Sequence, residues 1–474
     1  MNKSNIWIHL TVAIVLVTFA AILGQIDRWR AALRSINTET QKTVQKPKTV
    51  RRSGTQAEPE VLVRFKPHVS LTEKRKITAR LNDRIEDRIE LVRGMVAIDD
   101  LDDADPSKVA AEYSAMTEFV EYAEPNYEIK PELPAFREVL RRPADQDTPV
   151  NTPNDPHFSD QWALYNSGQN GGKANADVSA LKAWQKNRGS KDVVVAVLDT
   201  GVDYTHADLA ANMWFRPETV PSYVDAELGT FNDRRGFNAV DNISDPMDDN
   251  GHGTHCAGVI GAEGNNEIGI AGINWNVQIM PLKFLGRGGF GSTKDAIEAI
   301  NYAVDRKKNG VNVRVISASW GSTQYSKALE DAIRAAGDEG ILFVAAAGNN
   351  SGDNDKRPHY PSNYDLPNVI SVAALDSSDL LASFSNFGAK TVHVAAPGKE
   401  IVSTWLNDGF REASGTSMAT PHVAGIAALI IANEPEISVK DLREKILSSV
   451  DRIDVLNGRI FSAGRINAAK ALGH

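Results

Sequence analysis

The stretch DVVVAVLD, Asp192 to Asp199, is a nearly continuous run of apolar residues that ends in an acid. Such a run is typical of a strand in a parallel sheet, because helices cover both faces of that sheet. Four later stretches have the same texture, and three others have helical spacing between or after them. The apolar stretches are 277–285, 313–320, 341–348 and 368–375, and the helical ones are 293–308, 326–340 and 439–450. The pattern predicts an α/β domain with a doubly wound, mostly parallel sheet and helices on both faces.

Polar residues at the strand ends are the first candidates for function, because ligands bind outside the carboxyl ends of the strands in such sheets. Asp199 ends the first strand, Ser319 ends another, and Asn349 follows a third. His252 opens the small-residue run GHGTHCAGVIGA, which predicts a helix packed close to the sheet. Taken alone, each of these residues has a structural interpretation as well as a functional one.

A serine lies in a similar position in SGTSMATPHVAGIAALI, residues 414–430. The spacing from Ala419 onward predicts a buried helix, which puts Ser417 at its first turn. Pro421 then falls within the first four helical residues, where its missing N–H costs no hydrogen bond. Ser417 either caps the helix or presents a reactive hydroxyl to its positive end. The chain order Asp199, His252, Ser417 is one of those known for catalytic triads.

Length and composition limit the class of protein. A chain of 474 residues that is 42% hydrophobic and 24% charged predicts two or three folded units. The formal net charge of −9 argues against nucleic acid as a partner. The single cysteine, Cys256, excludes an intrachain disulfide, so an exported domain would depend on core burial or bound ions.

The amino terminus indicates export. Residues 6–24 are nearly all apolar, so 1–24 is interpreted as a signal peptide or a membrane anchor. Three arginines follow this run and outweigh Lys3, which favours a secretory signal over an anchor with its carboxyl side outside. Residues 25–58 have the composition of a flexible basic segment. We therefore expect a secreted or extracytoplasmic protein that contacts a membrane before processing.

A smaller unit precedes the main domain. Residues 59–130 show the order β-α-β-β-α-β of a ferredoxin-like α+β fold, with one strand expected at 88–93. Residues 131–153 are rich in Pro, Asp and Asn and predict an exposed, cleavable linker. The main domain then occupies 154–474.

Four ordered blocks of the main domain resemble the signature blocks of subtilisin-like serine proteases, in particular their thermitase-like branch. They are VAVLDTGVDYTHADL (195–209), DDNGHGTHCAGVIGA (248–262), AAAGN (345–349) and SGTSMATPHVAG (414–425). The similarity runs from about Asn154 to the carboxyl terminus. Residues 59–130 are similar to the inhibitory prodomain of that family in their element order and in the ending VEYAEPNY of the last expected strand.

The resemblance implies a serine endopeptidase. Ser417 would attack the peptide carbonyl, His252 would take its proton, and Asp199 would hold the imidazole in the right tautomer. Asn349 and the backbone N–H of Ser417 would bind the oxyanion. The protein would be a monomeric zymogen that cuts its own linker, and its partners would be protein or peptide substrates and its own prodomain, which acts as intramolecular inhibitor.

The family's substrate-binding segments fall on two stretches, where a peptide would add as an extra strand. They correspond to Gly289, Phe290 and Gly291 and to Ser319, Trp320 and Gly321, and the side-chain pocket adds Ala346, Ala347 and Gly348. Trp320 is larger than expected for a pocket wall, and its alternative interpretation is packing beneath the strand.

The resemblance also implies a structural calcium ion. Asp155, Asp208 and the side chain of Asn266 would supply ligands, with backbone oxygens of Gly264, Ile268 and Ile270. The alternative is a polar surface loop. The insertion 214–246 is longer than in compact relatives, and the sequence gives it no role.

The motifs also allow four competing interpretations. GRGGFG, 286–291, with Asp305 fits a dinucleotide fingerprint, but the resemblance assigns the same glycines to the substrate edge. His252 and His255 lack the further ligands of a zinc site. A lipase-type esterase would need its acid and histidine after the serine. A catalytically silent binding or scaffold protein would have no need to keep the acid, imidazole, hydroxyl and amide together.

Overall fold

The computed structural model describes residues 60–130, 136–139 and 152–474. The expected signal or anchor, 1–24, and the basic segment, 25–58, lie outside the described residues. Within the part that is described, no helix combines the length and the apolar character needed to cross a membrane.

A sheet of nine strands forms the centre of the main domain. Its strands are parallel except for β19, which pairs antiparallel with β20 at one end. Each of the five apolar stretches predicted as strands forms one of its members. The spatial order is β10 (Phe237–Asn238), β11 (Asn276–Lys283), β7 (Gly189–Asp199), β13 (Val313–Ala318), β14 (Leu342–Ala346), β15 (Val369–Leu375), β16 (Val394–Pro397), β20 (Gly464–Ile466) and β19 (Val450–Arg452).

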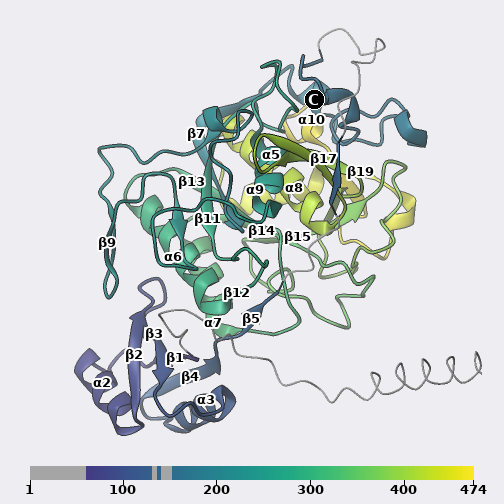
Figure 1. Cartoon of the computed structure of the whole chain (residues 1–474). Helices are drawn as coiled ribbons and strands as arrows, with labels where there is room; N and C mark the ends of the chain where they lie inside the picture. The colour runs from purple at the N-terminus through teal and green to yellow at the C-terminus, as the bar shows by residue number, and fades with distance from the viewer. Residues whose placement is uncertain (1–59, 131–135, 140–151) are drawn as a thin grey trace, which may run out of the picture. The chain divides into compact units, whose positions relative to one another are not determined.

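Helices cover both faces of this sheet, as Figure 1 shows. Alternate residues of β7 separate the two layers: Val193, Val195 and Val197 enter the core under α5 and α8, while Val194 and Leu198 enter the core under α6 and α7. The helices are α5 (His252–Gly261), α8 (Thr416–Asn433) and α9 (Val439–Ser448) on one side, and α6 (Thr293–Lys308) and α7 (Lys327–Asp338) on the other. The predicted doubly wound architecture is confirmed.

The start of α8 differs from the sequence-based prediction. The helix begins at Thr416 after Gly415, so Ser417 is its second residue and not an N-cap. Pro421 is therefore the sixth helical residue, and its missing N–H does remove a bond to the carbonyl of Ser417. That carbonyl accepts instead from the hydroxyl of Ser319 at 2.9 Å and contacts the Cys256 sulfur at 3.6 Å. Side chains from other elements thus replace the helical bond.

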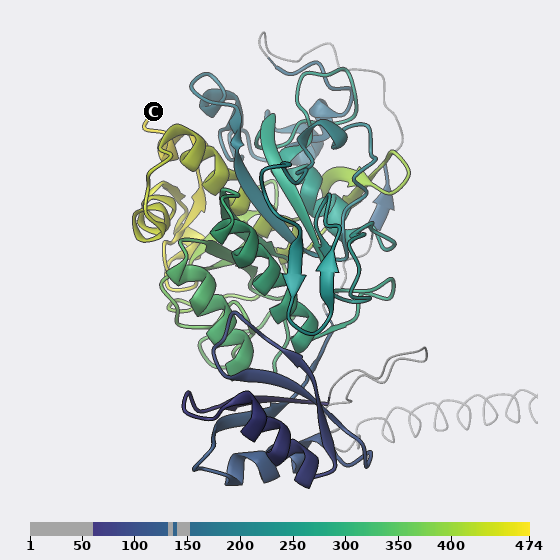
Figure 2. The ribbon, with the colours of Figure 1, turned by 90° about the vertical axis from the view of Figure 1, so that its left-hand side faces the viewer.

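The amino-terminal unit has the predicted β-α-β-β-α-β order, seen in a second view in Figure 2. Its strands are β1 (Val61–Phe65), β2 (Asp83–Arg88), β3 (Met95–Asp100) and β4 (Val120–Pro125), and its helices are α2 (Leu71–Arg80) and α3 (Pro106–Ala115). The sheet order is β2-β3-β1-β4, with every pair antiparallel. Val61, Val63 and Phe65 pack against α2 and α3, and the opposite face, with Leu62 and Ala97, joins the core that contains α6 and α7.

The strand expected at 88–93 is wrong. The strand lies earlier, at Asp83–Arg88, and the following residues form the turn to β3. Ile89 and Val92 are buried, but they are held in turns by hydrogen bonds from Val92 N to Ile89 O at 3.3 Å and from Met95 N to Val92 O at 2.9 Å. Their apolar character reflects burial in a turn rather than a strand.

Shorter elements complete the described chain. Two strands precede or lie within the expected linker: β5 (Glu128–Ile129) pairs with β12 (Gly291–Ser292), and β6 (Phe136–Glu138) pairs with β18 (Gly409–Ala413). The others are β8 (Tyr223–Asp225), β9 (Gly229–Phe231), β17 (Ile401–Trp405), α4 (Ala180–Ala183), α10 (Ala468–Ala471) and the 3₁₀ turns η1 (Phe158–Asp160), η2 (Gln169–Gly171), η3 (Ala210–Asn212) and η4 (Asp454–Leu456). Residues 136–138 thus form a paired strand within the expected linker, and Arg137 and Glu138 are exposed there.

Candidate active site

Asp199 and His252 are joined by a hydrogen bond. The Asp199 Oδ1 atom lies 2.7 Å from His252 Nδ1, and both side chains are buried. Asp199 ends β7 and His252 opens α5, so the sheet edge and the helix start bring together residues 53 positions apart. The carboxylate therefore orients the ring and leaves Nε2 as its second functional atom, which has no hydrogen-bond partner among the described residues.

The charge of Asp199 also controls the protonation of this imidazole. Burial lowers the pKa of His252, but the carboxylate charge and hydrogen bond of Asp199 outweigh it, and the net pKa is raised above its usual 6.5. The more distant carboxylate of Asp248 acts in the same direction. The ring is thus a stronger base than an isolated histidine.

Asp248 organises the start of α5, and the sequence analysis did not single it out. Its Oδ1 accepts the N–H groups of Asn250 and Gly251, both at 2.9 Å, and its Oδ2 accepts from the backbone and hydroxyl of Thr254. The N-cap of α5 is Gly251 and not Asp248, so the usual capping pattern could not have identified this acid. Through these bonds it fixes the turn that presents His252.

Ser417 lies at the start of α8 with its hydroxyl bound to another strand end. Its Oγ donates to the Ser319 carbonyl at 3.0 Å, while the Ser319 hydroxyl donates to the Ser417 carbonyl at 2.9 Å. Cys256, one turn beyond His252 on α5, places its sulfur within 4.8 Å of ligand atoms of both Asp199 and His252 and contacts the Ser417 carbonyl. The acid and the imidazole therefore lie beside Cys256, which also contacts the backbone of Ser417, while the Ser417 hydroxyl is bonded to Ser319 in this conformation.

Asn349 is fixed beside the serine. Its Oδ1 accepts the backbone N–H of Thr416 at 2.8 Å and the Thr416 hydroxyl at 2.9 Å. These two bonds use the amide oxygen as acceptor, so they leave the amide nitrogen of Asn349 to donate elsewhere. Thr416 also bonds the N–H of Gly348 at 3.2 Å, so the segment after β14 and the start of α8 are tied together. Thr416 was missed by the sequence analysis, and its position directly before Ser417 was the only signal.

The two expected substrate segments differ in their contacts with the rest of the chain. Gly291 is paired antiparallel with Ile129, so one of the two segments already accepts a strand from the amino-terminal unit. In the other segment, Ser319 contacts Ser417, but the Trp320 indole donates to Leu198 O at 2.9 Å and packs against Phe284 in the core. The packing alternative for Trp320 therefore describes its side chain, and only its backbone is left to face a substrate.

The remaining expected pocket residues lie at the end of β14. Ala346, its last residue, and Ala347 are buried, and Gly348 has a positive φ of 106°. A Cβ at Gly348 would lie 2.5 Å from the Asn386 amide nitrogen, so this position excludes larger residues. Gly289 forms a turn with Gly286, and the exposed Phe290 ring lies 4.7 Å from the Lys130 ammonium.

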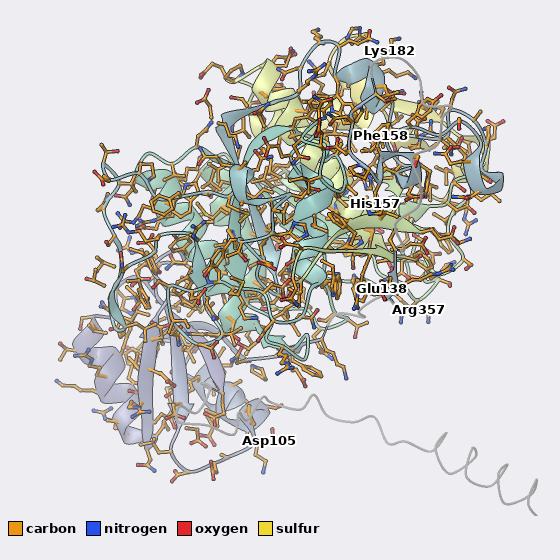
Figure 3. The ribbon with its side chains drawn as sticks, turned by 45° about the horizontal axis from the view of Figure 1, so that its top comes forward. Asp105, Glu138, His157, Phe158, Lys182 and Arg357 are labelled. Atoms are coloured by element: carbon orange, nitrogen blue, oxygen red, sulfur yellow. The ribbon has the colours of Figure 1, made fainter. Side chains whose placement is uncertain are left out.

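Phe136 brings the chain between the two units next to the histidine. Its ring centroid lies 6.5 Å from that of His252 and 4.1 Å from that of Trp405, and β6 pairs with β18 just before α8. Glu138, labelled in Figure 3, ends this strand. No pattern in the sequence indicated that this segment would reach the site.

The expected calcium ligands converge on one loop. The buried Asp208 carboxylate accepts from the Asn266 amide and from Ile270 N, both at 2.9 Å, and Asp155 accepts from Asn265 N at 2.7 Å and Asn266 N at 3.1 Å. The next residues, His157 and Phe158 (Figure 3), anchor the segment through His157 N to Gly269 O at 2.7 Å. Burial is the main cause that raises the pKa of Asp155 to about 6 and that of Asp208 to about 7, and the charge of Asp155 further raises the pKa of Asp208.

This donor set fits a hard cation. Among the described residues, no basic side chain forms an ion pair with these two buried carboxylates, so a positive ion would stabilise their charged forms. Calcium prefers carboxylate, amide and carbonyl oxygens. The Asn266 nitrogen now faces Asp208 and its oxygen accepts from Ile268 N at 2.8 Å, so a turn of the amide would present oxygen to an ion. Gly264, Ile268 and Ile270 belong to the same loop and could add carbonyl oxygens.

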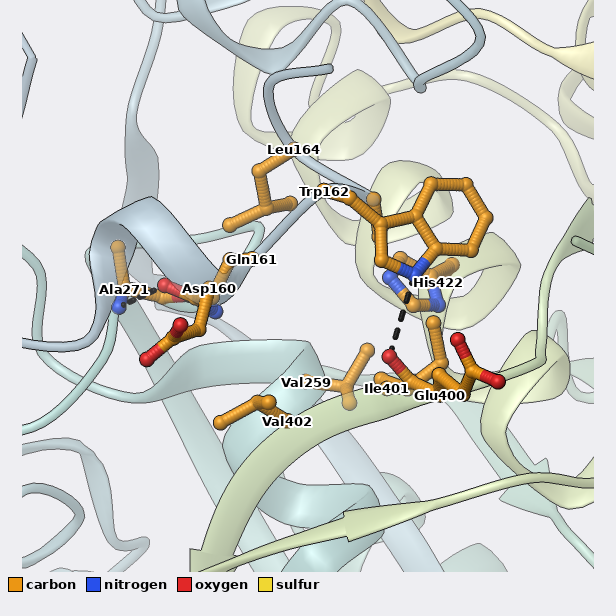
Figure 4. Close-up of a pocket in the computed structure, with 11 residues that line it drawn as sticks. Asp160, Gln161, Trp162, Leu164, Val259, Ala271, Glu400, Ile401, Val402 and His422 are labelled. Atoms are coloured by element: carbon orange, nitrogen blue, oxygen red, sulfur yellow. Dashed lines mark hydrogen bonds between the residues drawn. The ribbon is translucent and has the colours of Figure 1, made fainter. Parts of the chain in front are cut away.

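A hollow elsewhere in the domain, shown in Figure 4, contains none of the predicted site residues. Trp162 donates from its indole to the carbonyl of Glu400 at 3.1 Å, Gln161 bonds Ala271, and His422 Nδ1 lies 2.8 Å from Met418 O. Burial lowers the pKa of His422 to about 4, so it is neutral. Structural hydrogen bonds account for these polar groups.

The competing interpretations of two motifs find little support. His255 is buried and shares its Nε2 between the carbonyls of Ile401 and Arg411, each at 3.1 Å, as a packed histidine would. Asp305, the expected ribose contact of a dinucleotide site, is engaged by Arg306 and Asn309. The glycines of 286–291 lead to the strand edge that Ile129 occupies.

Comparison with known proteins identifies the family of this chain. Residues 190–464 match the model of the subtilase family, Peptidase S8. The chain is 34% identical to a "Thermophilic serine proteinase" of Bacillus sp. (strain AK1), over 97% of this chain and 98% of that protein. It is 37% identical to "Thermitase" of Thermoactinomyces vulgaris, over 68% of this chain and 99% of that protein.

Solved structures show the same fold. Fervidolysin from Fervidobacterium pennivorans, described as a keratinolytic enzyme related to subtilisin, matches with a TM-score of 0.69 at 24% identity. The match covers 90% of this chain and spans 62% of the length of that structure. A protease of Pseudoalteromonas arctica matches with a TM-score of 0.55 at 30% identity, over 68% of this chain and 99% of that one.

Proposed function

Because this chain belongs to the subtilase family of proteases and is a serine endopeptidase, we propose that Ser417 is its nucleophile, His252 its general base and Asp199 the carboxylate that orients the base. The observation that carries the proposal is the 2.7 Å bond between Asp199 and His252 beside the start of α8, with His252 Nε2 left without a partner.

The first chemical step would require a change at the serine. Its hydroxyl now donates to Ser319 O, and rotation about the Cα–Cβ bond would redirect Oγ away from that carbonyl toward the imidazole. His252 would then take the proton as Oγ attacks the peptide carbonyl, and later give it to the leaving amine. The raised pKa of His252 favours the first transfer.

The negative charge on the tetrahedral intermediate needs fixed donors. The Asn349 amide nitrogen is oriented by the two bonds that its oxygen accepts from Thr416, and the backbone N–H of Ser417 belongs to the first turn of α8, where no helical carbonyl can bond it. We propose that these two groups bind the oxyanion, with the positive end of the helix dipole behind them.

We further propose that residues 59–130 are an inhibitory prodomain and that the enzyme matures by cutting its own linker. Two side chains near the end of this unit support docking, because they occupy the starts of two helices. Glu124 accepts from Lys327 N at 2.8 Å and Ala328 N at 3.2 Å on α7, and Asn126 accepts from Lys294 N at 2.9 Å on α6. Ile129 then pairs with Gly291 in the proposed substrate segment.

The described residues before and after 131–135 lie close to the proposed active site. Ile129 is paired with Gly291 in one of the proposed substrate segments. Phe136 lies beside His252 on β6, which pairs with β18, the strand that leads to Ser417. This supports a first cut between Lys130 and Phe136, within the interval from about Lys130 to Asp155 that the sequence allows. Export through the amino-terminal apolar stretch remains a separate proposal, supported by the sequence alone.

We propose that calcium binds between Asp155, Asp208 and the loop 264–270 as a structural ion. When bound, it would neutralise two buried carboxylates and join the segment after the linker to the loop beyond α5. No catalytic role follows from this position.

Labelling with a serine-directed fluorophosphonate tests the proposed nucleophile. The wild-type chain should become labelled and shorten itself, and Ser417→Ala should do neither. Ser414→Ala is a matched control, because its exposed hydroxyl bonds only Glu400 N among the described contacts. Labelling of Ser417→Ala, or an unlabelled but folded wild type, would instead favour a catalytically silent binding or scaffold protein on this fold.

A further inference from the structure

The insertion 214–246, which the sequence left without a role, contacts the amino-terminal unit through its hairpin of β8 and β9. Arg88 on β2 pairs with Glu227 at 2.5 Å, and Ala226 N donates to Glu90 Oε1 at 3.1 Å. On helix α6, Asn301 donates both to Glu90 Oε2 and to the Tyr223 hydroxyl of the hairpin, each at 3.0 Å. The hairpin, α6 and β2 therefore meet at one junction.

The centre of the junction holds an excess of buried acids. Asp87 from β2, Asp225 from the hairpin and Glu298 from α6 have carboxylate oxygens within 4.8 Å of one another, and each residue is at most 2% exposed. The only cation that is ion-paired within this group among the described residues is Lys294, whose ammonium lies 2.9 Å from Asp87. Three carboxylates thus surround one ammonium.

Hydrogen bonding does not compensate for this excess. Asp225 Oδ1 accepts from Glu227 N at 2.8 Å and Leu228 N at 2.7 Å, but Asp225 Oδ2 and Glu298 Oε1 are buried with no hydrogen-bond partner in the described structure. A buried, unpartnered carboxylate oxygen is costly when ionised, whereas a protonated carboxyl can donate to a neighbouring carboxylate. The arrangement suits protons shared among the acids.

We propose that the β8–β9 hairpin and helix α6 form a docking surface for the chain's own prodomain, and that docking takes up protons, so that the prodomain detaches more readily as the pH rises. This inference rests on the proposed role of residues 59–130 as the prodomain. Departure of β2 would expose Asp225 and Glu298 to water and remove the charge of Asp87.

The direction follows from the pKa values in the docked state. Burial, followed by the charge of Asp87, raises the pKa of Glu298 well above 4.5, and the same two causes raise the pKa of Asp225. After release both pKa values return toward their ordinary range. When docking raises the pKa of a carboxyl group, proton binding favours the docked state. This stabilisation is fully present at a pH below the ordinary pKa of the released state, and it is lost as the pH rises through the raised pKa of the docked state.

The other charged groups at the junction do not reverse this direction. From β2 they are Asp87 and Arg88, and from the turn after it, Glu90; from the hairpin, Tyr223, Asp225 and Glu227; from α6, Lys294, Asp295, Glu298 and Arg306. Burial lowers the pKa of Lys294, but Asp87 and Glu298 raise it further than burial lowers it, so its ammonium stays charged in the docked state. The Arg88–Glu227 pair adds attraction between the hairpin and β2.

Hydrogen–deuterium exchange of the full chain carrying Ser417→Ala tests this inference without any proteolysis. The reporters are peptides that contain Ala226 and Lys327, whose N–H groups bond Glu90 and Glu124 of the amino-terminal unit. After correction for intrinsic exchange, we expect the opening of both contacts to increase between pH 6 and pH 8. One linked proton gives at most about tenfold per pH unit, or about 100-fold over this interval.

Glu298→Gln should reduce this pH dependence, because an amide of the same shape does not titrate and Asp225 is left as the remaining acid of the pair. Should Glu298→Gln fail to fold, Glu90→Gln serves as a second variant at the rim of the junction and should reduce the dependence in part. Equal corrected exchange at both pH values, or an unchanged dependence in the folded glutamine variants, would overturn proton-linked docking.

Two arginines of β2 provide a matched pair for the hairpin contact. Arg88→Ala should increase exchange at Ala226, whereas Arg84→Ala should not, because Arg84 pairs with Asp99 inside the amino-terminal unit and its side chain is 62% exposed. Equal behaviour of the two variants would show that the hairpin is no docking surface. Fluorophosphonate labelling of the wild type tests the protease proposal separately, so failure of one does not imply failure of the other.

Discussion

Ser417 and Ser319 exchange two hydrogen bonds, one from each hydroxyl to the other residue's carbonyl, at 3.0 and 2.9 Å. The first bond orients the hydroxyl of Ser417, the proposed nucleophile, toward the Ser319 carbonyl. The second satisfies the carbonyl that loses its helical partner because Pro421 has no N–H. The end of β13 and the start of α8 are thus connected through the residue that would carry out the reaction.

Removal of the Ser319 hydroxyl should therefore destabilise the start of α8. We expect Ser319→Ala to reduce the free energy of unfolding by about 1 kcal/mol, the typical value for one buried hydrogen bond. In a Pro421→Ala background the new backbone N–H can bond Ser417 O, so the same substitution should cost less. A double-mutant cycle by denaturant unfolding measures this coupling. Additive effects, or an equal loss in the control Ser322→Ala, whose hydroxyl accepts only from Gln324 N among the described contacts, would contradict the proposed compensation.

Asp199→Asn should impair catalysis while leaving the fold intact. An asparagine in this position cannot stabilise the imidazolium and favours the wrong tautomer, and the analogous change in another serine protease lowers kcat about 10⁴-fold. Steady-state hydrolysis of a peptide substrate measures the effect. Asp192→Asn, on the exposed first part of β7, is the control and should be neutral. A loss below tenfold in Asp199→Asn would argue against the proposed triad.

Asn349→Ala should lower kcat with little change in KM. Its amide would bind charge that develops only in the transition state, and loss of one such donor costs about 10²–10³-fold, a range measured in subtilisin itself, a member of this family. Because Asn349 also accepts two bonds from Thr416, the melting temperature must be measured in parallel. A rise in KM at constant kcat would point to ground-state binding instead.

The acid limb of the pH–activity profile should lie above pH 6.5. The base must be neutral to accept a proton, and the pKa of His252 is raised, so activity should fall as the pH drops through that raised value. The pH dependence of kcat/KM reports this group in the free enzyme. In Asp199→Asn the limb should move to lower pH, because the charge that raises the pKa is gone. A limb well below 6.5 in the wild type would contradict this assignment.

Chelation should lower the melting temperature of the processed enzyme. An ion present at 100 times its Kd adds about 2.7 kcal/mol to the stability of the folded state. Asp208→Asn should reduce the calcium-dependent shift, whereas the exposed Asp192→Asn should keep it. An unchanged melting curve in excess chelator would exclude the proposed calcium site.

Self-cleavage should first occur between Lys130 and Phe136. Intact-mass analysis of early products from the wild-type chain, with Ser417→Ala as the uncut control, locates the new termini. Later trimming toward Asp155 is compatible with this prediction. A first product that retains residues 131–151 on the amino-terminal fragment would show that the bracketing strands do not mark the cut.

Much of the architecture followed from the sequence. The apolar runs that became β7, β11, β13, β14 and β15 have no polar face, which only a sheet covered on both sides accommodates. Helix α6 has the predicted bounds, because a capping serine and an amphipathic spacing act locally. Asp199, His252, Ser417 and Asn349 were predicted as site residues from their types, their order and the resemblance of their motifs.

Local pattern was insufficient where distant residues replace local bonds. The sequence could not show that Ser319 supplies the partner that Pro421 removes, so the start of α8 was predicted too late. Ile89 and Val92 were read as part of a strand because burial alone does not distinguish a strand from a buried turn.

The sequence by itself determined the fold class and the chemistry of the candidate residues, since periodicity and side-chain type are properties of the chain. Only the tertiary structure decided that Phe136 lies beside His252, that the Trp320 indole belongs to the core, and that Asp87, Asp225 and Glu298 share one buried junction. These contacts join segments far apart in the chain. They form because the burial of apolar surface brings whole elements together, and no local pattern records which side chains then meet.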